Sequence, residues 1–143
     1  MFLGEYQHNL DLKGRVAMPA KFRTGLKKGA IITRGIDECL FVFDKDEWQK
    51  LADKLVALPI TQANSRAFTR LMLAGAAEAP IDGQGRVLVP DYLRMYAKLD
   101  REAVIIGLYS RVEIWDKKVW NKYKYRTEKQ SEKIAEQLRE LGI

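Results

Sequence analysis

The chain has almost none of the residues on which most enzymes depend. His8 is its only histidine and Cys39 its only cysteine, so no cluster of histidines and cysteines can hold zinc. A single cysteine also excludes an intramolecular disulfide, and the apolar run that contains Cys39 predicts a buried thiol. Neither a serine-centred elbow nor a phosphate-binding glycine loop with its lysine is present. We therefore expect no catalytic residue, no metal and no cofactor, and a protein that is not an enzyme.

Long apolar runs are missing as well. No stretch reaches the roughly 20 apolar residues of a membrane-spanning helix, and the N-terminus lacks the basic start and apolar core of a signal peptide. We expect a cytoplasmic protein without a membrane partner. The 143 residues, of which 47% are hydrophobic and 31% charged, suffice for one compact domain or for two small ones that share a core.

Positive charge is in excess and is unevenly distributed. The formal net charge of +6 favours a polyanionic partner, such as nucleic acid or an acidic membrane surface. Residues 1–35 have seven lysines and arginines against two acidic residues, whereas residues 76–111 have five of each. Residues 117–143 have eight basic and four acidic residues, but these alternate as on a solvated helix. The positive field is therefore concentrated near the N-terminus.

One element occurs twice in the chain. Residues 10–23, LDLKGRVAMPAKFR, align with residues 81–94, IDGQGRVLVPDYLR, and share Asp, Gly, Arg, Val, Pro and a final Arg. After a shift of one residue the match resumes, because CLFVFD at 39–44 parallels RVEIWD at 111–116, and a tryptophan follows four residues after each. Two copies indicate a tandem pair and exclude a solenoid.

Each copy predicts a strand, a tight turn, a second strand, a short helix and a β-hairpin. Asp and Gly suit the turn, since one supplies a side-chain acceptor and the other tolerates positive φ. The proline suits the first position of the helix. The predicted helices are residues 20–26 and 91–96, and the predicted hairpin strands are residues 30–34 with 39–43 and 103–108 with 111–115.

Further helices are predicted between the copies and after them. Apolar residues at spacings of three and four predict a helix over residues 45–58, with acidic residues at its start that favour the helix dipole. A second helix is expected over residues 64–74, with Asn64 or Ser65 as its N-cap and Gly75 as its end. From residue 117 onwards the chain again has a helical pattern, which either frays or meets another subunit.

The repeated Asp-x-x-Gly-Arg turn allows two interpretations. In the structural one, Asp and Arg form a surface ion pair that contributes little energy. In the functional one, the arginine forks onto a guanine edge or clamps a phosphate while the aspartate orients it. Recurrence in register, in a basic protein, favours the second interpretation. The candidate DNA-binding residues are Asp11, Lys13, Arg15, Lys21, Arg23, Asp82 and Arg86.

These motifs resemble the MraZ family, whose members have two AbrB-like domains. The resemblance runs nearly from end to end and includes MFLGEY at the start, RAFTR at 66–70, GAAE at 75–78 and RVEIWD at 111–116. It implies an α+β fold in which two swapped-hairpin-like β-barrel halves pack together, with connecting and C-terminal helices. We expect a first repeat over residues 1–50, a helical connection over 51–75, a second repeat over 76–121 and a helical tail over 122–143.

The resemblance also implies a function. Members of the family are transcriptional repressors of the division and cell-wall gene cluster, which bind tandem promoter repeats as a ring, usually octameric. By motif position, Asp11 and Arg15 would belong to the first DNA-reading loop, and Asp82 and Arg86 to the second. Such a regulator is associated with the nucleoid.

The two loops differ in one charge, since Gln84 stands where the first loop has Lys13. We hypothesise that the first repeat makes most of the DNA contacts and that the second mainly supports packing or assembly. The main alternative function is a protein-interaction or antitoxin-like module of the AbrB type. Nucleotide binding at residues 82–85 is disfavoured, because no lysine or serine follows in the right place. For His8 we favour a position at the sheet edge over a phosphate contact.

Overall fold

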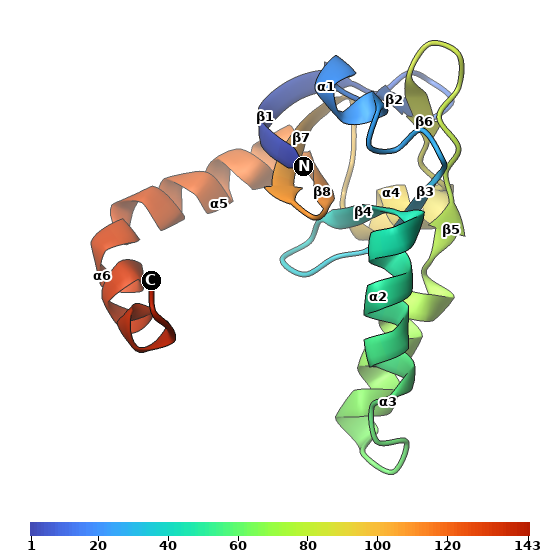
Figure 1. Ribbon diagram of the computed structural model, residues 1–143. Helices are drawn as coiled ribbons and strands as arrows, with labels where there is room; N and C mark the ends of the chain where they lie inside the picture. The colour runs from blue at the N-terminus through green and yellow to red at the C-terminus, as the bar shows by residue number, and fades with distance from the viewer.

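The protein has a β-rich body from which two helical segments project. The computed structural model describes residues 1–143. In Figure 1 one projection is a helical hairpin from the middle of the chain, and the other is the C-terminal arm. None of the helices is both long and apolar enough to cross a bilayer.

The elements follow one another in the order that the repeat predicts. The strands are β1 (Phe2–Asn9), β2 (Arg15–Ala17), β3 (Ala30–Arg34), β4 (Leu40–Asp44), β5 (Ala77–Glu78), β6 (Arg86–Leu88), β7 (Glu102–Tyr109) and β8 (Val112–Asp116). The α-helices are α1 (Ala20–Arg23), α2 (Lys45–Val56), α3 (Ala63–Thr69), α4 (Asp91–Tyr96), α5 (Lys117–Lys129) and α6 (Ser131–Gln137). A π-helical turn, η1 (Arg70–Ala74), continues α3, and a 3-10 turn, η2 (Arg139–Leu141), follows α6.

The two repeats exchange their first strands. The main sheet has the order β1-β7-β8-β4-β3-β5, and the two hairpins meet at its centre, where β4 pairs with β8. β1 of the first repeat pairs with β7 of the second, and β5 of the second repeat pairs with β3 of the first. β2 and β6 form a separate antiparallel ribbon. The predicted α+β class and the swapped arrangement of the halves are confirmed.

The repeats also share their core. Val16 and Met18 of the first copy lie in the same buried cluster as Val87 and Val89 of the second. A second cluster, which includes the fully buried Cys39, is covered by α2, η1 and α5. The prediction of a buried thiol is confirmed. Because small units bury too little apolar surface alone, the exchange lets each repeat complete the core of the other.

Several helix boundaries follow the sequence closely. α4 spans the predicted residues, Asp91–Tyr96. The Asp44 side chain caps α2 by accepting a hydrogen bond from the amide of Glu47 at 2.9 Å, which confirms the structural role predicted for these acids. Asp116, the equivalent residue of the second repeat, caps α5 in the same way. The repeated aspartate therefore ends a strand and begins a helix in both copies.

The helix predicted over residues 20–26 is shorter than expected. It ends at Arg23, and Thr24 and Gly25 are both weak helix formers. Gly25 also lies against the Phe2 ring, because a β-carbon there would come within 2.8 Å of the ring. The chain after Arg23 therefore packs against β1 and does not continue the predicted helix. The prediction for residues 45–58 was closer, and α2 ends at Val56.

The N-cap predicted for the second connecting helix was wrong. The helix begins at Ala63 after Gln62, without a side-chain cap, so neither Asn64 nor Ser65 has that role. The Gln62 carbonyl accepts from the Arg66 amide at 3.1 Å, and this first helical bond sets the start one residue earlier. The predicted end is confirmed, since Gly75 follows the last residue of η1.

Candidate nucleic-acid interface

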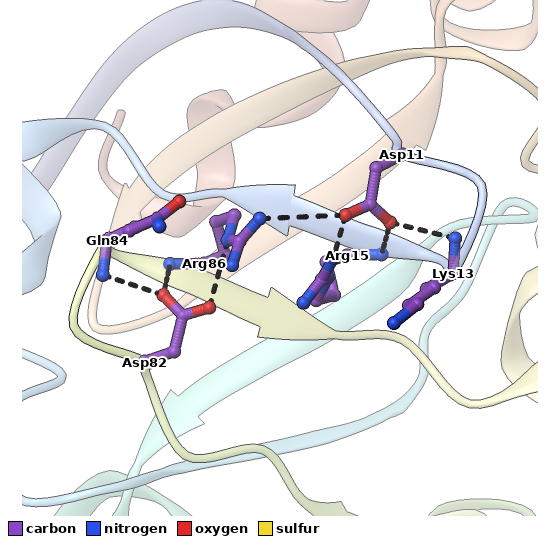
Figure 2. A network of polar contacts seen from close by, with 6 residues as sticks. All are labelled: Asp11, Lys13, Arg15, Asp82, Gln84 and Arg86. Carbon is purple, nitrogen blue, oxygen red and sulfur yellow. Dashed lines mark hydrogen bonds and ion pairs between the residues drawn. The ribbon is translucent and has the colours of Figure 1, made fainter.

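The first Asp-x-x-x-Arg motif forms a tight turn that its own aspartate closes. Asp11 Oδ1 accepts from the amides of Lys13 and Arg15 at 3.0 and 2.9 Å. Asp11 Oδ2 accepts from Arg15 Nε at 2.7 Å. Gly14 has a φ of +84°, a left-handed conformation that glycine adopts without strain. The carboxylate therefore fixes both the turn and the direction of the arginine, as Figure 2 shows.

The second motif repeats this geometry. Asp82 Oδ1 accepts from the amides of Gln84 and Arg86, both at 2.9 Å, and Oδ2 accepts from Arg86 Nε at 2.9 Å. Gly85 has a φ of +79°. In each turn the backbone hydrogen bond from the arginine is the largest cause that lowers the pKa of the aspartate. Both aspartates are therefore charged acceptors at neutral pH.

The β2–β6 ribbon brings the two arginines onto one surface. In its register Arg15 lies opposite Leu88, and Ala17 lies opposite Arg86. Because directly paired residues point to the same face of a sheet, these four side chains share one face. The intervening pair, Val16 and Val87, is fully buried on the other face. The ribbon thus has an apolar inner face and an outer face with two arginines.

The two turns are in contact across this outer face. Arg86 Nη1 lies 3.8 Å from Asp11 Oδ2, in addition to its bond with Asp82. Figure 2 shows the Arg86 side chain between the two carboxylates. Arg15 pairs with Asp11 alone. The positive charge of Arg86 is therefore balanced by two carboxylates and that of Arg15 by one.

The final arginine of each repeat lies at the turn of the other repeat. A β-carbon at Gly85 would overlap the Arg23 guanidinium, and one at Gly14 would overlap that of Arg94. Arg23 was predicted from its sequence position to accompany the first turn, but the structure places it against the second. Arg94 was not among the predicted site residues. The signal that would have found it is its identity with Arg23 at the end of the repeat.

The remaining candidates lie around this ribbon. Lys13 is exposed in the first turn, and Lys21 is exposed on α1. His8 lies on the edge strand β1, where burial and then the charge of Arg23 lower its pKa. Its imidazole is thus neutral at pH 7. Burial raises the pKa of the Cys39 thiol, and no three His, Cys, Asp or Glu residues are grouped as metal ligands would be.

Comparison with known proteins gives matches over the full length of the chain. The family described as "MraZ protein, putative antitoxin-like" matches twice, over residues 1–71 and 72–141. A protein of Carboxydothermus hydrogenoformans is 52% identical over 138 residues, 96% of each chain. One of Desulforamulus reducens is 49% identical over 141 residues, 99% of each chain. One of Caldanaerobacter subterraneus is 48% identical over 143 residues, all of both chains. All three are named "Transcriptional regulator MraZ".

The fold and the site together define a class of protein. It is an α+β protein of two interlocked β-rich repeats, with a ribbon of paired arginines and aspartates at their junction. With both halves matched by the family and with relatives of about half identical sequence over the whole length, the chain belongs to the MraZ family.

Proposed function

We propose that this protein is a transcriptional regulator that binds double-stranded DNA with the outer face of the β2–β6 ribbon. The observation that carries the proposal is the presence of Arg15 and Arg86 on this face, each oriented by a carboxylate. An oriented guanidinium can donate two hydrogen bonds to the edge of a guanine. The name shared by the relatives supports a role in transcription.

The dimensions of the ribbon suit the major groove, which admits a two-stranded β-ribbon. Arg15 and Arg86 are diagonal neighbours, because Arg86 pairs with the residue two positions beyond Arg15. Such neighbours lie about 7–8 Å apart, roughly two base-pair steps of 3.4 Å. Ala17 and Leu88 share this face with them, and apolar side chains can contact thymine methyl groups. We expect a binding site with guanines about two steps apart.

The other candidate residues have supporting roles in the proposal. Asp11 and Asp82 orient the arginines, while Lys13, Lys21 and Arg23 attract phosphates. The first turn contributes more than the second, for two reasons. It has Lys13 where the second turn has Gln84, and Arg15 shares its charge with one carboxylate while Arg86 shares its charge with two.

Self-association completes the proposal. A bidentate arginine contact discriminates between bases by about 1–3 kcal/mol, which is too little to select a promoter. We propose that copies form a ring, octameric as in the family, which binds tandem repeats upstream of the division and cell-wall gene cluster and represses it at the nucleoid. Linked ribbons on repeated sites multiply their affinities. Exposed apolar residues of the C-terminal arm, Leu138, Leu141 and Ile143, support contact with another copy.

Titration of DNA from upstream of the protein's own gene tests this function. Fluorescence anisotropy should show tight binding only when the duplex has more than one repeat, with affinity that falls steeply as salt rises. The mass in solution should be that of an oligomer both with and without DNA. Full affinity of a monomer for a single repeat would contradict the proposal.

The alternative is a protein-interaction module, which the words "antitoxin-like" in the family description favour. Its basic face would then bind an acidic protein surface in place of DNA. A gel shift at physiological salt with an excess of unrelated competitor DNA distinguishes the two, because the alternative predicts no selective retardation of upstream DNA by the purified protein. Retardation that Arg15→Ala removes would support DNA binding instead.

A further inference from the structure

The close approach of each arginine to the opposite turn is supported by the backbone. The Gly14 carbonyl accepts from the Val89 amide at 2.9 Å, and the Gly85 carbonyl accepts from the Met18 amide at 2.8 Å. Each turn glycine therefore bonds to the strand end of the other repeat. The proline and short helix that follow then place the final arginine of that repeat over the same glycine.

The two glycines are required on two grounds. Both have positive φ, and both lie where any side chain would collide with a guanidinium from the other repeat. The absence of a side chain lets the Arg94 guanidinium lie against Gly14, which stands between Lys13 and Arg15 in the chain. In the second turn it lets the Arg23 guanidinium lie against Gly85, the residue before Arg86.

Neither of these arginines is neutralised by a buried partner. Arg94, whose side chain is 25% exposed, pairs with Asp91, whose side chain is 86% exposed, and an ion pair with a solvent-exposed partner contributes little energy. The Arg23 Nε donates to the Met18 carbonyl at 3.1 Å, which orients the guanidinium without adding negative charge. Both guanidinium groups remain able to bind an anion.

We propose that DNA phosphates bind at two composite sites, each made of the turn of one repeat and the final arginine of the other. The first site joins Lys13 and Arg15 to Arg94, and the second joins Arg86 to Arg23. This inference rests on the proposed DNA binding and adds Arg94 to the interface. Neither repeat then forms a complete site alone. The positive charge at each site therefore comes from both repeats and cannot be counted from one of them.

The salt dependence of binding to a mixed-sequence duplex tests the first site. Such binding depends on phosphates, and each phosphate contact contributes about 0.9 to the slope of log affinity against log salt. Arg94→Met should therefore lower the slope by about 0.9, while the slope of Arg94→Lys should remain that of the original protein. Lys50→Met is the matched control. Lys50 also pairs with an acid three residues earlier on a helix, but it lies on α2, in the projecting helical hairpin.

The outcomes separate this inference from the proposed function. Absence of DNA binding by the unchanged protein overturns both. Binding with an unchanged slope for a folded Arg94→Met variant overturns the composite site alone, as does an equal loss with Lys50→Met. Thermal unfolding monitors the fold. If Arg94→Met does not fold, Arg94→Gln takes its place with the same expected loss of slope, and an unchanged slope in a folded Arg94→Gln variant overturns the proposal.

A double-mutant cycle tests which arginine belongs to which turn. Residues at one site couple, whereas separate sites contribute independently. Arg94→Met should couple with Arg15→Ala, so that the double variant loses less than the product of the two fold-changes in affinity. With Arg86→Ala, whose contact with Asp11 links it to the first turn, the coupling should be smaller. The reverse pattern, in which Arg94 couples more strongly with Arg86 than with Arg15, would overturn the exchange between repeats.

Discussion

The two turns of the ribbon have nearly the same backbone and different surroundings. Each has an aspartate that accepts two backbone amides and the arginine Nε, and each has a left-handed glycine. At the tip, however, the first turn has Leu12 and Lys13, where the second has Gly83 and Gln84. The identical residues are therefore those that build the turn, and the residues that differ are those that face solvent.

Within each turn, one set of residues therefore builds the backbone and another set is available to contact DNA. The shared residues make two equivalent scaffolds, related by the strand exchange. Charge then makes the scaffolds unequal, because Arg86 lies between two carboxylates and the second turn lacks a lysine. The comparison predicts equal effects for substitutions that change the backbone and unequal effects for substitutions that change charge.

The largest effect is expected from the turn glycines and should be equal in both turns. Gly14→Ala and Gly85→Ala each force a side chain into the left-handed region, at a cost of roughly 1–2 kcal/mol, and displace a guanidinium as well. Urea unfolding measures the loss. Gly83→Ala is the control, since no atom lies within 4 Å of the added carbon. A loss at only one of the two positions would show that the turns are not equivalent scaffolds.

A smaller effect is expected when the charge difference at the tips is reversed. Lys13→Gln should lower the salt slope of DNA binding by about 0.9, and Gln84→Lys should raise it by a similar amount. Stability should not change in either variant, because both side chains are exposed. Anisotropy at several salt concentrations measures the slope. An unchanged slope in both variants would remove Lys13 from the interface.

The smallest effect concerns the aspartates and pH. The pKa of Asp11 is lowered in the folded protein, so its stabilising effect is present above the ordinary pKa, near 4, and is lost as the pH falls through the lower folded value. The difference in melting temperature between the original protein and Asp11→Asn should therefore be constant from neutral pH to about 5 and shrink below about 4. Asp82→Asn should show the same pH dependence but a smaller decrease in melting temperature than Asp11→Asn, because Asp82 contacts one arginine and Asp11 contacts two. A difference that already shrinks at pH 6 would contradict this assignment.

Much of the fold was predictable because the repeated sequence indicates where the equivalent strands, turns and helices of the two halves lie. The Asp-to-Pro segments, the hairpins and the helix after Asp44 all have local signals, which the structure confirms. The strand exchange between β1 and β7 has no local signal, and it was expected only from the family resemblance. At Thr24 and Gly25 a local signal was misleading. The sequence predicts a helix through residue 26, but the helix ends at Arg23, where β1 packs against the chain.

The sequence predicts the two turns of the candidate site, but it does not predict which residues from elsewhere in the chain pack against each turn. Asp11 with Arg15, and Asp82 with Arg86, were identified from spacing alone, because each pair lies within one turn. Arg23 and Arg94 contact residues about 60–80 positions away in the chain, and a charge count by sequence segment assigns them to the wrong turn. Only the exchange of strands reveals which turn each one serves.

The most direct test of the inequality between the turns is the affinity of Arg15→Ala and Arg86→Ala for upstream DNA, measured side by side by anisotropy. Loss of a bidentate contact at Arg15 should cost about 1–3 kcal/mol, which is about 5-fold to 150-fold in affinity. Arg86→Ala should weaken binding less, and thermal unfolding should show that both variants are folded. Equal losses would contradict a dominant first turn, and no loss in either variant would contradict the ribbon as the DNA-binding surface.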